Sequence, residues 1–291
     1  CLSAADKLIS SMKPDLTKIS ALIFVTQTPD YFLPSNAAIA HRNLKLPIDC
    51  AAFDVNQGCA GYVYGLWLAS MILNGSQDGE SVFLLAGDTM TRCADSTDPV
   101  TRPIFGDAGS ATMLISDRKS NSLFFDLNMD GSGVDSLIIE AGGFRNLSMS
   151  GDHFKPILKM HGLDIYNRAM QRVPETVRNI LKFSNLRIAD IDNFIFHQAN
   201  DFILRNLVAK IKMDLSRVPL GIVGKYGNHG PSSIPVTICE EPCRFLTNSK
   251  QNNLLCGFGT GFSWASAIID LSATRIINSS MGDKKNEKGS V

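Results

Sequence analysis

The sequence predicts an α/β protein built from two halves. Short runs rich in β-branched and other apolar residues alternate with longer stretches in which apolar residues recur at helical spacing. This alternation occurs in both halves and is typical of mostly parallel, buried strands connected by helices. Each half also ends with a glycine-rich turn that leads into a strand, at 105–115 and at 257–269. The similarity of the two endings indicates an internal duplication.

The first half is expected to alternate strands and helices in a regular order. Apolar residues at helical spacing over 2–12 stop before Pro14, where a helix should end. The β-branched run 19–26 predicts a buried strand, and Ser35 or Asn36 can cap the helix that follows. The expected strands are 19–26, 51–55, 81–86 and 111–115, and the expected helices are 2–12, 37–44 and 59–74.

The second half repeats the alternation with a longer helix. Pro174 is expected to kink that helix, and the polar segment 117–122 is expected to join the halves. Residues 273–291 are polar and are expected to be disordered, so the chain divides into 1–117, 118–272 and a tail. The expected strands are 124–129, 136–140, 192–196, 253–258 and 263–271, and the expected helices are 164–183, 202–212 and 236–245.

Composition argues against several classes of protein. The 291 residues are 44% hydrophobic, and 28 basic residues balance 28 acidic ones, which gives no support for binding to nucleic acid or to a membrane surface. No apolar run is long enough to span a membrane. Seven scattered cysteines favour a reducing cytoplasm over disulfides and predict no metal site. Cys1 opens the chain within an expected helix, so we expect the natural N-terminus to lie further upstream.

Cys59 is the first candidate for chemistry. It follows the strand 51–55 and Gly58, and an almost uncharged helical run begins after it. At a helix N-terminus, unpaired N–H groups and the macrodipole favour an anion, so the pKa of the Cys59 thiol should fall. Gly58 and Gly61 should let another backbone or a substrate come close. The competing interpretation is a structural cysteine, because free cysteines are usually buried.

Two further candidates lie in the second half of the chain. His197 follows the strand 192–196, and Asn228 lies in a loop rich in glycine, proline and serine. A cysteine, a histidine and an asparagine can form a nucleophile site whose polar partners orient and polarise a carbonyl group. Taken singly, His197 could be a hydrogen-bonded residue at a strand end, and Asn228 could be a turn residue.

Together with their neighbours, these residues resemble a known family. The similar segments are DVNQGCAGYVYGL at 54–66, FGDAG at 105–109, HQAN at 197–200, GN at 227–228 and GFGTGFSW at 257–264. The chain resembles β-ketoacyl-(acyl carrier protein) synthase III, a family of thiolase-like condensing enzymes, from residue 1 to about residue 271. The resemblance implies a layered αβαβα core made of two pseudo-duplicated α/β halves.

The resemblance also implies a reaction. Cys59 would take an acyl group from a thioester, and the backbone N–H groups of Cys59 and Thr260 would form the oxyanion hole. His197 and Asn228 would donate hydrogen bonds to the carbonyl oxygen of a malonyl thioester while carbon dioxide leaves. The enolate formed in this way would attack the acyl group on Cys59. Two neutral donors around a developing oxyanion make physical sense, because one such donor is typically worth about 3 kcal/mol.

Substrates, partners and location follow from the same resemblance. Coenzyme A thioesters or acyl-carrier thioesters would be substrates, with no bound cofactor and no metal, in cytoplasmic fatty acid or polyketide biosynthesis. Phe258 and Gly259 would line the substrate site. Leu33 would shape the acyl pocket of the other subunit in a homodimer.

The chain departs from the family pattern at several points. The strand and helix that normally precede the position of Cys1, with a tryptophan and an arginine that help to hold coenzyme A, are absent from this sequence. Pro99 stands where well-known members stack an arginine on adenine, and Phe202 stands where they have a basic residue that docks the carrier protein. His229-Gly230-Pro231 replaces small polar residues. These departures leave the identity of the carrier open.

Three other functions remain open from the sequence. Cys59 could pass its acyl group to an oxygen or nitrogen nucleophile with His197 as the base, an alternative that the unusual His229 favours. Cysteine hydrolases also use Cys, His and Asn in this order, although the local signature of papain-like enzymes is missing here. A chain without the first strand could also be a non-catalytic subunit that pairs with a complete partner.

Overall fold

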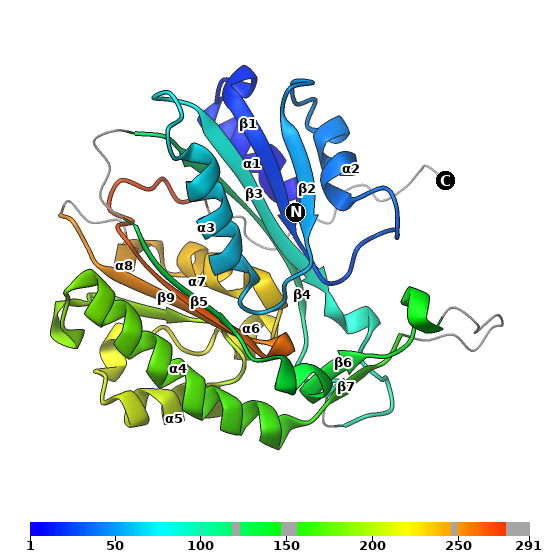
Figure 1. Cartoon of the computed structure of the whole chain (residues 1–291), viewed down its shortest axis with the longest axis vertical. Coiled ribbons are helices and arrows are strands. Elements are labelled where there is room, and N and C mark those ends of the chain that lie inside the picture. Colours follow the sequence, from blue (N-terminus) through cyan, green and yellow to red (C-terminus); the bar gives the residue numbers. More distant parts are fainter. Residues whose placement is uncertain (100, 118–122, 147–155, 246–248, 278–291) are drawn as a thin grey trace.

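The chain folds into two main sheets that helices separate and cover (Figure 1). The computed structural model describes residues 1–99, 101–117, 123–146, 156–245 and 249–277. The helices are α1 (Leu2–Met12), α2 (Asn36–Asn43), α3 (Gly61–Leu73), α4 (Gly162–Ser184), α5 (Asp201–Ile211), α6 (Ile222–Tyr226), α7 (Ser233–Glu240) and α8 (Pro242–Phe245). In space, α1 and α2 cover the first sheet, α3 and α7 lie between the sheets, and α4 and α5 cover the second. The predicted αβαβα layers are therefore confirmed.

The first sheet is mostly parallel. Its strands are β1 (Ile19–Val25), β2 (Ala51–Val55), β3 (Ser81–Thr89) and β4 (Asp107–Ile115), in the order β2-β1-β3-β4. β1 pairs in parallel with β2 and with β3, whereas β4 runs antiparallel to β3. The parallel strands are connected by segments that contain α2 and α3, as parallel crossovers require.

The second sheet is mostly antiparallel, so the sequence prediction of mostly parallel strands is wrong there. Its strands are β5 (Phe124–Met129), β8 (Asn193–Phe196), β9 (Asn253–Gly259) and β10 (Ser263–Ile269), in the order β5-β10-β9-β8. Only β8 and β9 are parallel, and β10 is antiparallel to both of its neighbours. The turn 260–262 between β9 and β10 is too short for a parallel crossover, which needs a dozen or more residues.

The two sheets share one arrangement of three strands. In the first, the parallel pair β1 and β3 is followed by the antiparallel strand β4. In the second, the parallel pair β8 and β9 is followed by the antiparallel strand β10. This repeated arrangement supports the internal duplication that the sequence indicates. A small separate sheet pairs β6 (Leu137–Ile139) with β7 (Leu158–Met160).

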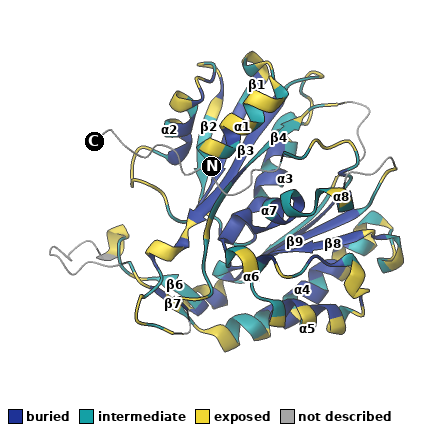
Figure 2. Cartoon of the chain, turned by 180° about the vertical axis from the view of Figure 1, so that it is seen from behind, coloured by how far each residue is buried: buried dark blue, intermediate teal, exposed yellow. Residues whose placement is uncertain are grey.

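Alternating side chains of the central strands build the core. Ile23 and Val25 of β1 join the middle layer around α3, while Leu22 and Phe24 face α1 and α2. Figure 2 shows the buried residues concentrated in β3, β9 and α7, with exposed residues on the outer helices. Both faces of the central strands are therefore covered, and the functional groups must lie at the strand ends.

Most predicted elements are present, with shifted boundaries. Ser35 is the N-cap of α2, and its hydroxyl accepts a hydrogen bond from the Ala38 N–H at 3.2 Å. α4 continues through Pro174 without a break. Residues 118–122, most of the predicted joint, and 278–291, most of the predicted disordered tail, lie outside the described residues. The prediction of disorder is wrong for the start of the tail, because Ile276 packs against the middle layer of the core.

Candidate active site

A narrow cavity lies between the carboxyl ends of the two sheets. Cys59, His197 and Asn228 all line it, although they are far apart in the sequence. Its volume of about 100 Å³ is well below the roughly 300–1,000 Å³ of pockets that hold drug-sized ligands, so it suits a thin chain. Other lining residues include Gln27, Asp88, Met160, Ile165, Ile203, Phe258, Gly259 and Thr260.

Cys59 reaches the cavity from the turn between β2 and α3. It precedes Ala60, the N-cap of α3, and so lies just outside the helix. The end of β9 passes directly over it: an added Cβ at Gly259 would lie 2.6 Å from the Cys59 sulfur, and one at Gly257 would lie 2.5 Å from the Cys59 carbonyl oxygen. Glycines at these positions allow this approach. Backbone from the second half of the chain therefore encloses the thiol.

The two glycines beside Cys59 accommodate side chains. An added Cβ at Gly58 would lie 2.3 Å from Gln27 Oε1, and one at Gly61 would lie 2.5 Å from Val25 Cγ1. The sequence predicts that another backbone or a substrate comes close at these glycines. The nearest neighbours are instead the side chains of Gln27, which follows β1, and Val25, at its end, so the predicted approach of a backbone is not found at either glycine.

The pKa of the Cys59 thiol is raised, and the predicted fall is wrong. Burial, and to a lesser extent the carboxylate of Asp88, raise the pKa of Cys59 to about 12. The backbone N–H groups of Thr260 and of Cys59 itself act in the opposite direction and lower it. Those two N–H groups donate toward the sulfur, but they do not offset the loss of solvent. The free protein therefore holds a neutral thiol.

Asp88 is a buried carboxylate of the cavity that the sequence reasoning missed. Its Oδ1 accepts hydrogen bonds from the Thr26 hydroxyl at 2.8 Å, the Gln27 N–H at 2.7 Å and the N–H and hydroxyl of Thr28 at 3.1 and 3.0 Å. Burial is the largest effect on Asp88 and raises the pKa of this carboxyl. Asp88 lies near the carboxyl end of β3. Its position could have identified it, because His197 was selected for its position at the end of a strand.

His197 is buried at the end of β8, with 1% of its surface exposed. Its N–H donates to the Cys256 carbonyl at 2.7 Å, which continues the pairing of β8 with β9. Its Nδ1 lies 2.7 Å from Ser233 Oγ, and its ring meets the Phe258 ring edge-on at 5.7 Å. Burial, with a further contribution from His229, lowers the pKa of His197 to about 3, so the ring is neutral.

Asn228 is held by a loop of the first half. Its N–H donates to the Ile104 carbonyl at 2.7 Å, and its carbonyl accepts from the Gly106 N–H at 2.9 Å. The side-chain Oδ1 accepts from the Gly230 N–H at 3.1 Å. With Oδ1 occupied in this way, Nδ2 is the amide group available to donate into the cavity. The site thus combines a thiol with a neutral ring and a neutral amide.

Not every residue that the sequence analysis placed at the site lines the cavity. Phe258, Gly259 and Thr260 line the cavity, but Leu33 does not and is 78% exposed. His229 lies beside Asn228 yet does not line the cavity. Its Nδ1 lies 2.8 Å from the Gly227 carbonyl oxygen, and its buried Nε2 has no hydrogen-bond partner among the residues that the structure describes. Because His229 does not line the cavity, the observation that favoured transfer to an oxygen or nitrogen nucleophile loses its weight.

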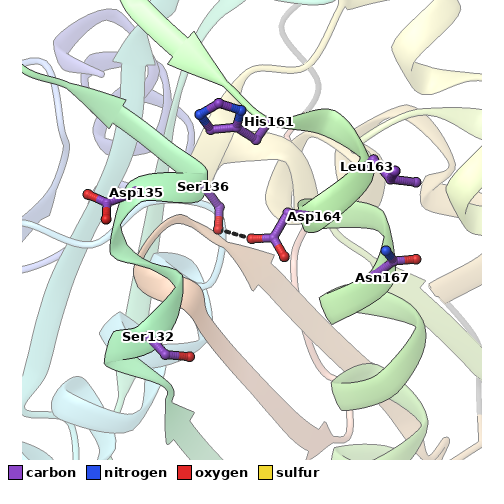
Figure 3. Close-up of a pocket in the computed structure, with 7 residues that line it drawn as sticks. All are labelled: Ser132, Asp135, Ser136, His161, Leu163, Asp164 and Asn167. Atoms are coloured by element: carbon purple, nitrogen blue, oxygen red, sulfur yellow. Dashed lines mark hydrogen bonds between the residues drawn. The ribbon is translucent and has the colours of Figure 1, made fainter.

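A second hollow of about 440 Å³ lies beside β6 and the start of α4 (Figure 3). Asp164 points to the Ser136 hydroxyl, with which it forms a hydrogen bond, and it also pairs with Arg168 at 2.8 Å. His161 and Asp135 point in other directions in this view. The polar groups of this hollow do not converge on a common point. We therefore assign the active site to the smaller cavity, which Cys59, His197 and Asn228 line.

The described part of the chain contains no group of three or more His, Cys, Asp or Glu side chains arranged to hold a metal ion. Among the same residues, no helix has both the length and the apolar character needed to cross a membrane. All seven cysteines are free.

Comparisons with known proteins identify two matching family models. Residues 53–133 match the model described as 3-oxoacyl-[acyl-carrier-protein (ACP)] synthase III, and residues 181–271 match the model of the synthase III C-terminal part. The first match contains Cys59, and the second contains His197, Asn228 and Thr260. The matched segments thus supply the thiol, the imidazole and the amide of the cavity, whereas the lining residues Gln27, Met160 and Ile165 lie outside both matches.

Individual relatives cover most of the chain. A Campylobacter jejuni protein named provisionally as a 3-oxoacyl-[acyl-carrier-protein] synthase 3 is 35% identical over 278 residues, which are 92% of this chain and 77% of the relative. A β-ketoacyl-[acyl-carrier-protein] synthase III of Chlamydia caviae is 33% identical over 91% of this chain and 80% of its own. The solved structure of a Burkholderia xenovorans 3-oxoacyl-(acyl-carrier protein) synthase has a TM-score of 0.88 at 36% identity, and the match covers 96% of this chain and 80% of that one.

Proposed function

Because the chain belongs to the 3-oxoacyl-[acyl-carrier-protein] synthase III family of condensing enzymes, we propose that it extends an acyl group by two carbons from a malonyl thioester, through an acyl-Cys59 intermediate. Cys59, His197 and Asn228 lie around one cavity, and this arrangement carries the proposal. The pathway is fatty acid or related polyketide biosynthesis.

The first step loads Cys59. The Cys59 sulfur attacks the carbonyl carbon of an acyl thioester, the bond from that carbon to the carrier sulfur breaks, and the thiol proton leaves with the carrier thiol. The N–H groups of Cys59 and Thr260, which donate toward the sulfur in the free protein, form the oxyanion hole for the tetrahedral intermediate. The thiol loses its proton during attack, because its raised pKa keeps it neutral beforehand.

The second step breaks one carbon–carbon bond and forms another. Carbon dioxide leaves the malonyl thioester, and the enolate oxygen accepts hydrogen bonds from His197 Nε2–H and Asn228 Nδ2–H. The enolate carbon then attacks the acyl carbon on Cys59, the Cys59 sulfur leaves, and it takes a proton from solvent. Neither donor gives up its proton, which fits an amide and a ring whose pKa of about 3 keeps it neutral. Phe258 and Gly259 line the substrate side of the cavity.

The reaction needs no bound cofactor in this proposal, since the thioester substrates bring all reacting groups. Coenzyme A and a carrier protein are both candidates for the thiol that delivers them. Phe202 is 67% exposed on α5 and stacks on Tyr166 at 5.7 Å, next to the lining residues Ile165 and Ile203. Phe202 stands where the family that the chain resembles has a basic residue. It supports a docking contact that depends less on charge than in the enzymes the sequence resembles.

We also propose a cytoplasmic homodimer. Tyr31, Phe32, Leu33 and Phe144 are each more than 60% exposed, and the rings of Phe32 and Phe144 lie 5.2 Å apart. A cluster of exposed apolar side chains of this kind marks an interaction surface. A second copy that covers it would receive Leu33 near its own cavity, and the seven free cysteines suit a reducing compartment. Sedimentation of wild type and Leu33→Asp tests the dimer, which the aspartate should dissociate.

Product analysis of three variants tests the reaction. With an acyl thioester and a malonyl thioester, Cys59→Ala should form no 3-oxoacyl product. His197→Ala and Asn228→Asp should each lose about 10²- to 10³-fold in malonyl decarboxylation, the usual cost of one oxyanion donor. Cys243→Ala, which removes an exposed thiol outside the cavity, is the matched control and should behave as wild type. Normal condensation by Cys59→Ala would reject the mechanism.

A further inference from the structure

The role of His197 depends on which ring nitrogen carries the proton. Because the pKa of His197 is lowered to about 3, the ring is neutral and holds a single N–H. With the proton on Nε2, the ring can donate to the enolate oxygen. With the proton on Nδ1, Nε2 offers a lone pair to that oxygen and repels it. This question rests on the function proposed above.

Nδ1 faces one hydroxyl group. Ser233 Oγ lies 2.7 Å from it, and both residues are buried, at 1% and 0% exposure. The same hydroxyl oxygen accepts a hydrogen bond from the Gln198 N–H at 3.4 Å. Among the described residues, no acceptor other than Nδ1 is recorded for the Ser233 hydroxyl proton. The pattern is satisfied when Ser233 donates to Nδ1, which leaves the ring proton on Nε2.

The hydroxyl is held in place by the fold. Ser233 is the first residue of α7, and its carbonyl accepts from the Thr237 hydroxyl at 2.7 Å. The neighbouring residues Ile234 and Ile238 are buried in the middle layer of the core. The donor is thus fixed on a helix that packs between the two sheets, which is the rigid support that a site residue needs.

Ser233 is the contact that decides the tautomer. The Gly230 backbone favours the protonated ring, but burial outweighs this effect on the pKa of His197 and keeps the ring neutral. Among the described residues, Ser233 Oγ is the hydrogen-bond partner recorded for Nδ1, and a hydroxyl can donate a proton to it. We propose that Ser233 is a positioning residue whose hydroxyl donates to His197 Nδ1 and thereby keeps His197 in the Nε2–H form that stabilises the enolate.

Nitrogen NMR of the histidine-labelled protein tests the tautomer directly. In the wild type, His197 should show a protonated Nε2 and an unprotonated Nδ1 that accepts a hydrogen bond. In Ser233→Ala, the Nδ1–H form should gain population. Ser232→Ala is the matched control: its hydroxyl is equally buried, one residue away, and donates to the His229 and Ala108 carbonyls instead. A wild-type ring with its proton on Nδ1 would overturn the proposal.

Kinetics separate this role from a merely structural one. Ser233→Ala should lower malonyl decarboxylation by about 10- to 100-fold, a part of the loss expected for removing one donor, while acyl loading of Cys59 stays within about twofold of wild type. In a His197→Ala background, Ser233→Ala should cause no further loss, because its effect passes through the ring. An equal loss in both backgrounds, or an equal loss in Ser232→Ala, would contradict the proposal.

The two hypotheses fail in different ways. If the wild type loads Cys59 but releases no carbon dioxide from malonyl thioesters, the proposed function is wrong. The NMR experiment still reads the tautomer of His197 and its dependence on Ser233. If decarboxylation proceeds normally and the Ser233→Ala ring keeps Nε2–H, the function stands and the role of Ser233 is refuted.

Discussion

A single added methyl group at residue 259 should disable the thiol of Cys59. In the structure, the Cβ of an alanine at this position would lie 2.6 Å from the Cys59 sulfur and 2.8 Å from its Cβ. Comfortable contacts between such atoms begin at about 3.5 Å. Either Cys59 or the end of β9 must therefore move by about 0.9 Å.

A shift of this size has two measurable consequences. Overpacking a fixed core typically costs about 1–3 kcal/mol, so the free energy of unfolding of Gly259→Ala should fall by that amount. Displacing a reacting group by about 1 Å can cost about 100-fold in rate. Acyl loading should therefore slow much more than the loss of stability alone would explain, because most of the variant remains folded at 25 °C.

Loading is measured by intact-protein mass spectrometry after timed mixing with an acyl thioester, and stability by urea unfolding. Gly131→Ala is the control, since an added Cβ there meets nothing within 4 Å. It should match the wild type in both assays. If Gly259→Ala loads at the wild-type rate with unchanged stability, the described approach of β9 to Cys59 is incorrect.

Four further predictions concern charge and protonation. Alkylation of Cys59 by iodoacetamide should rise about tenfold per pH unit beyond pH 9, where an ordinary thiol levels off, because the raised pKa of about 12 delays formation of the thiolate. Asp88→Asn should speed that alkylation at pH 8, about tenfold for each unit by which the pKa of Cys59 falls, because a negative charge is removed; a slower reaction would contradict this. Malonyl decarboxylation should stay constant within about twofold from pH 5 to pH 8, because the pKa of His197 is lowered to about 3 and its ring stays neutral above that value; a sigmoidal loss near pH 6.5 would show that the ring titrates. Phe202→Arg should lower the KM for an acidic carrier thioester severalfold and leave the KM for the coenzyme A thioester unchanged, which steady-state kinetics with both donors would show.

Hydrophobic patterning predicted most of the strands and helices, and the family resemblance supplied their arrangement in layers. The strand β5 and the helix α1 have the bounds that were predicted, because apolar runs and a following proline mark them locally. The antiparallel direction of β9 and β10 was readable but was not inferred. The expected strands 253–258 and 263–271 leave four residues between them, too few for a parallel crossover.

The site residues that lie just beyond the ends of strands could be predicted from the sequence. Cys59 and His197 lie just beyond expected strands, and Asn228 lies in a glycine-rich loop. All three were candidates from the residues themselves, and the family resemblance gave them their roles. The pKa of Cys59 was predicted in the wrong direction, because the helix start is visible in the sequence whereas the cover that β9 provides is not. Ser233 was missed because its importance comes from one contact across the fold, with a residue 36 positions earlier.

Peptide-mapped mass spectrometry tests the central claim most directly. The protein is loaded with an acyl thioester, freed of excess donor and then mixed with a malonyl thioester. The account predicts one acyl adduct, on the peptide that contains Cys59, and its discharge with equal amounts of carbon dioxide and a 3-oxoacyl thioester. An adduct on another residue, or discharge without carbon dioxide, would contradict it.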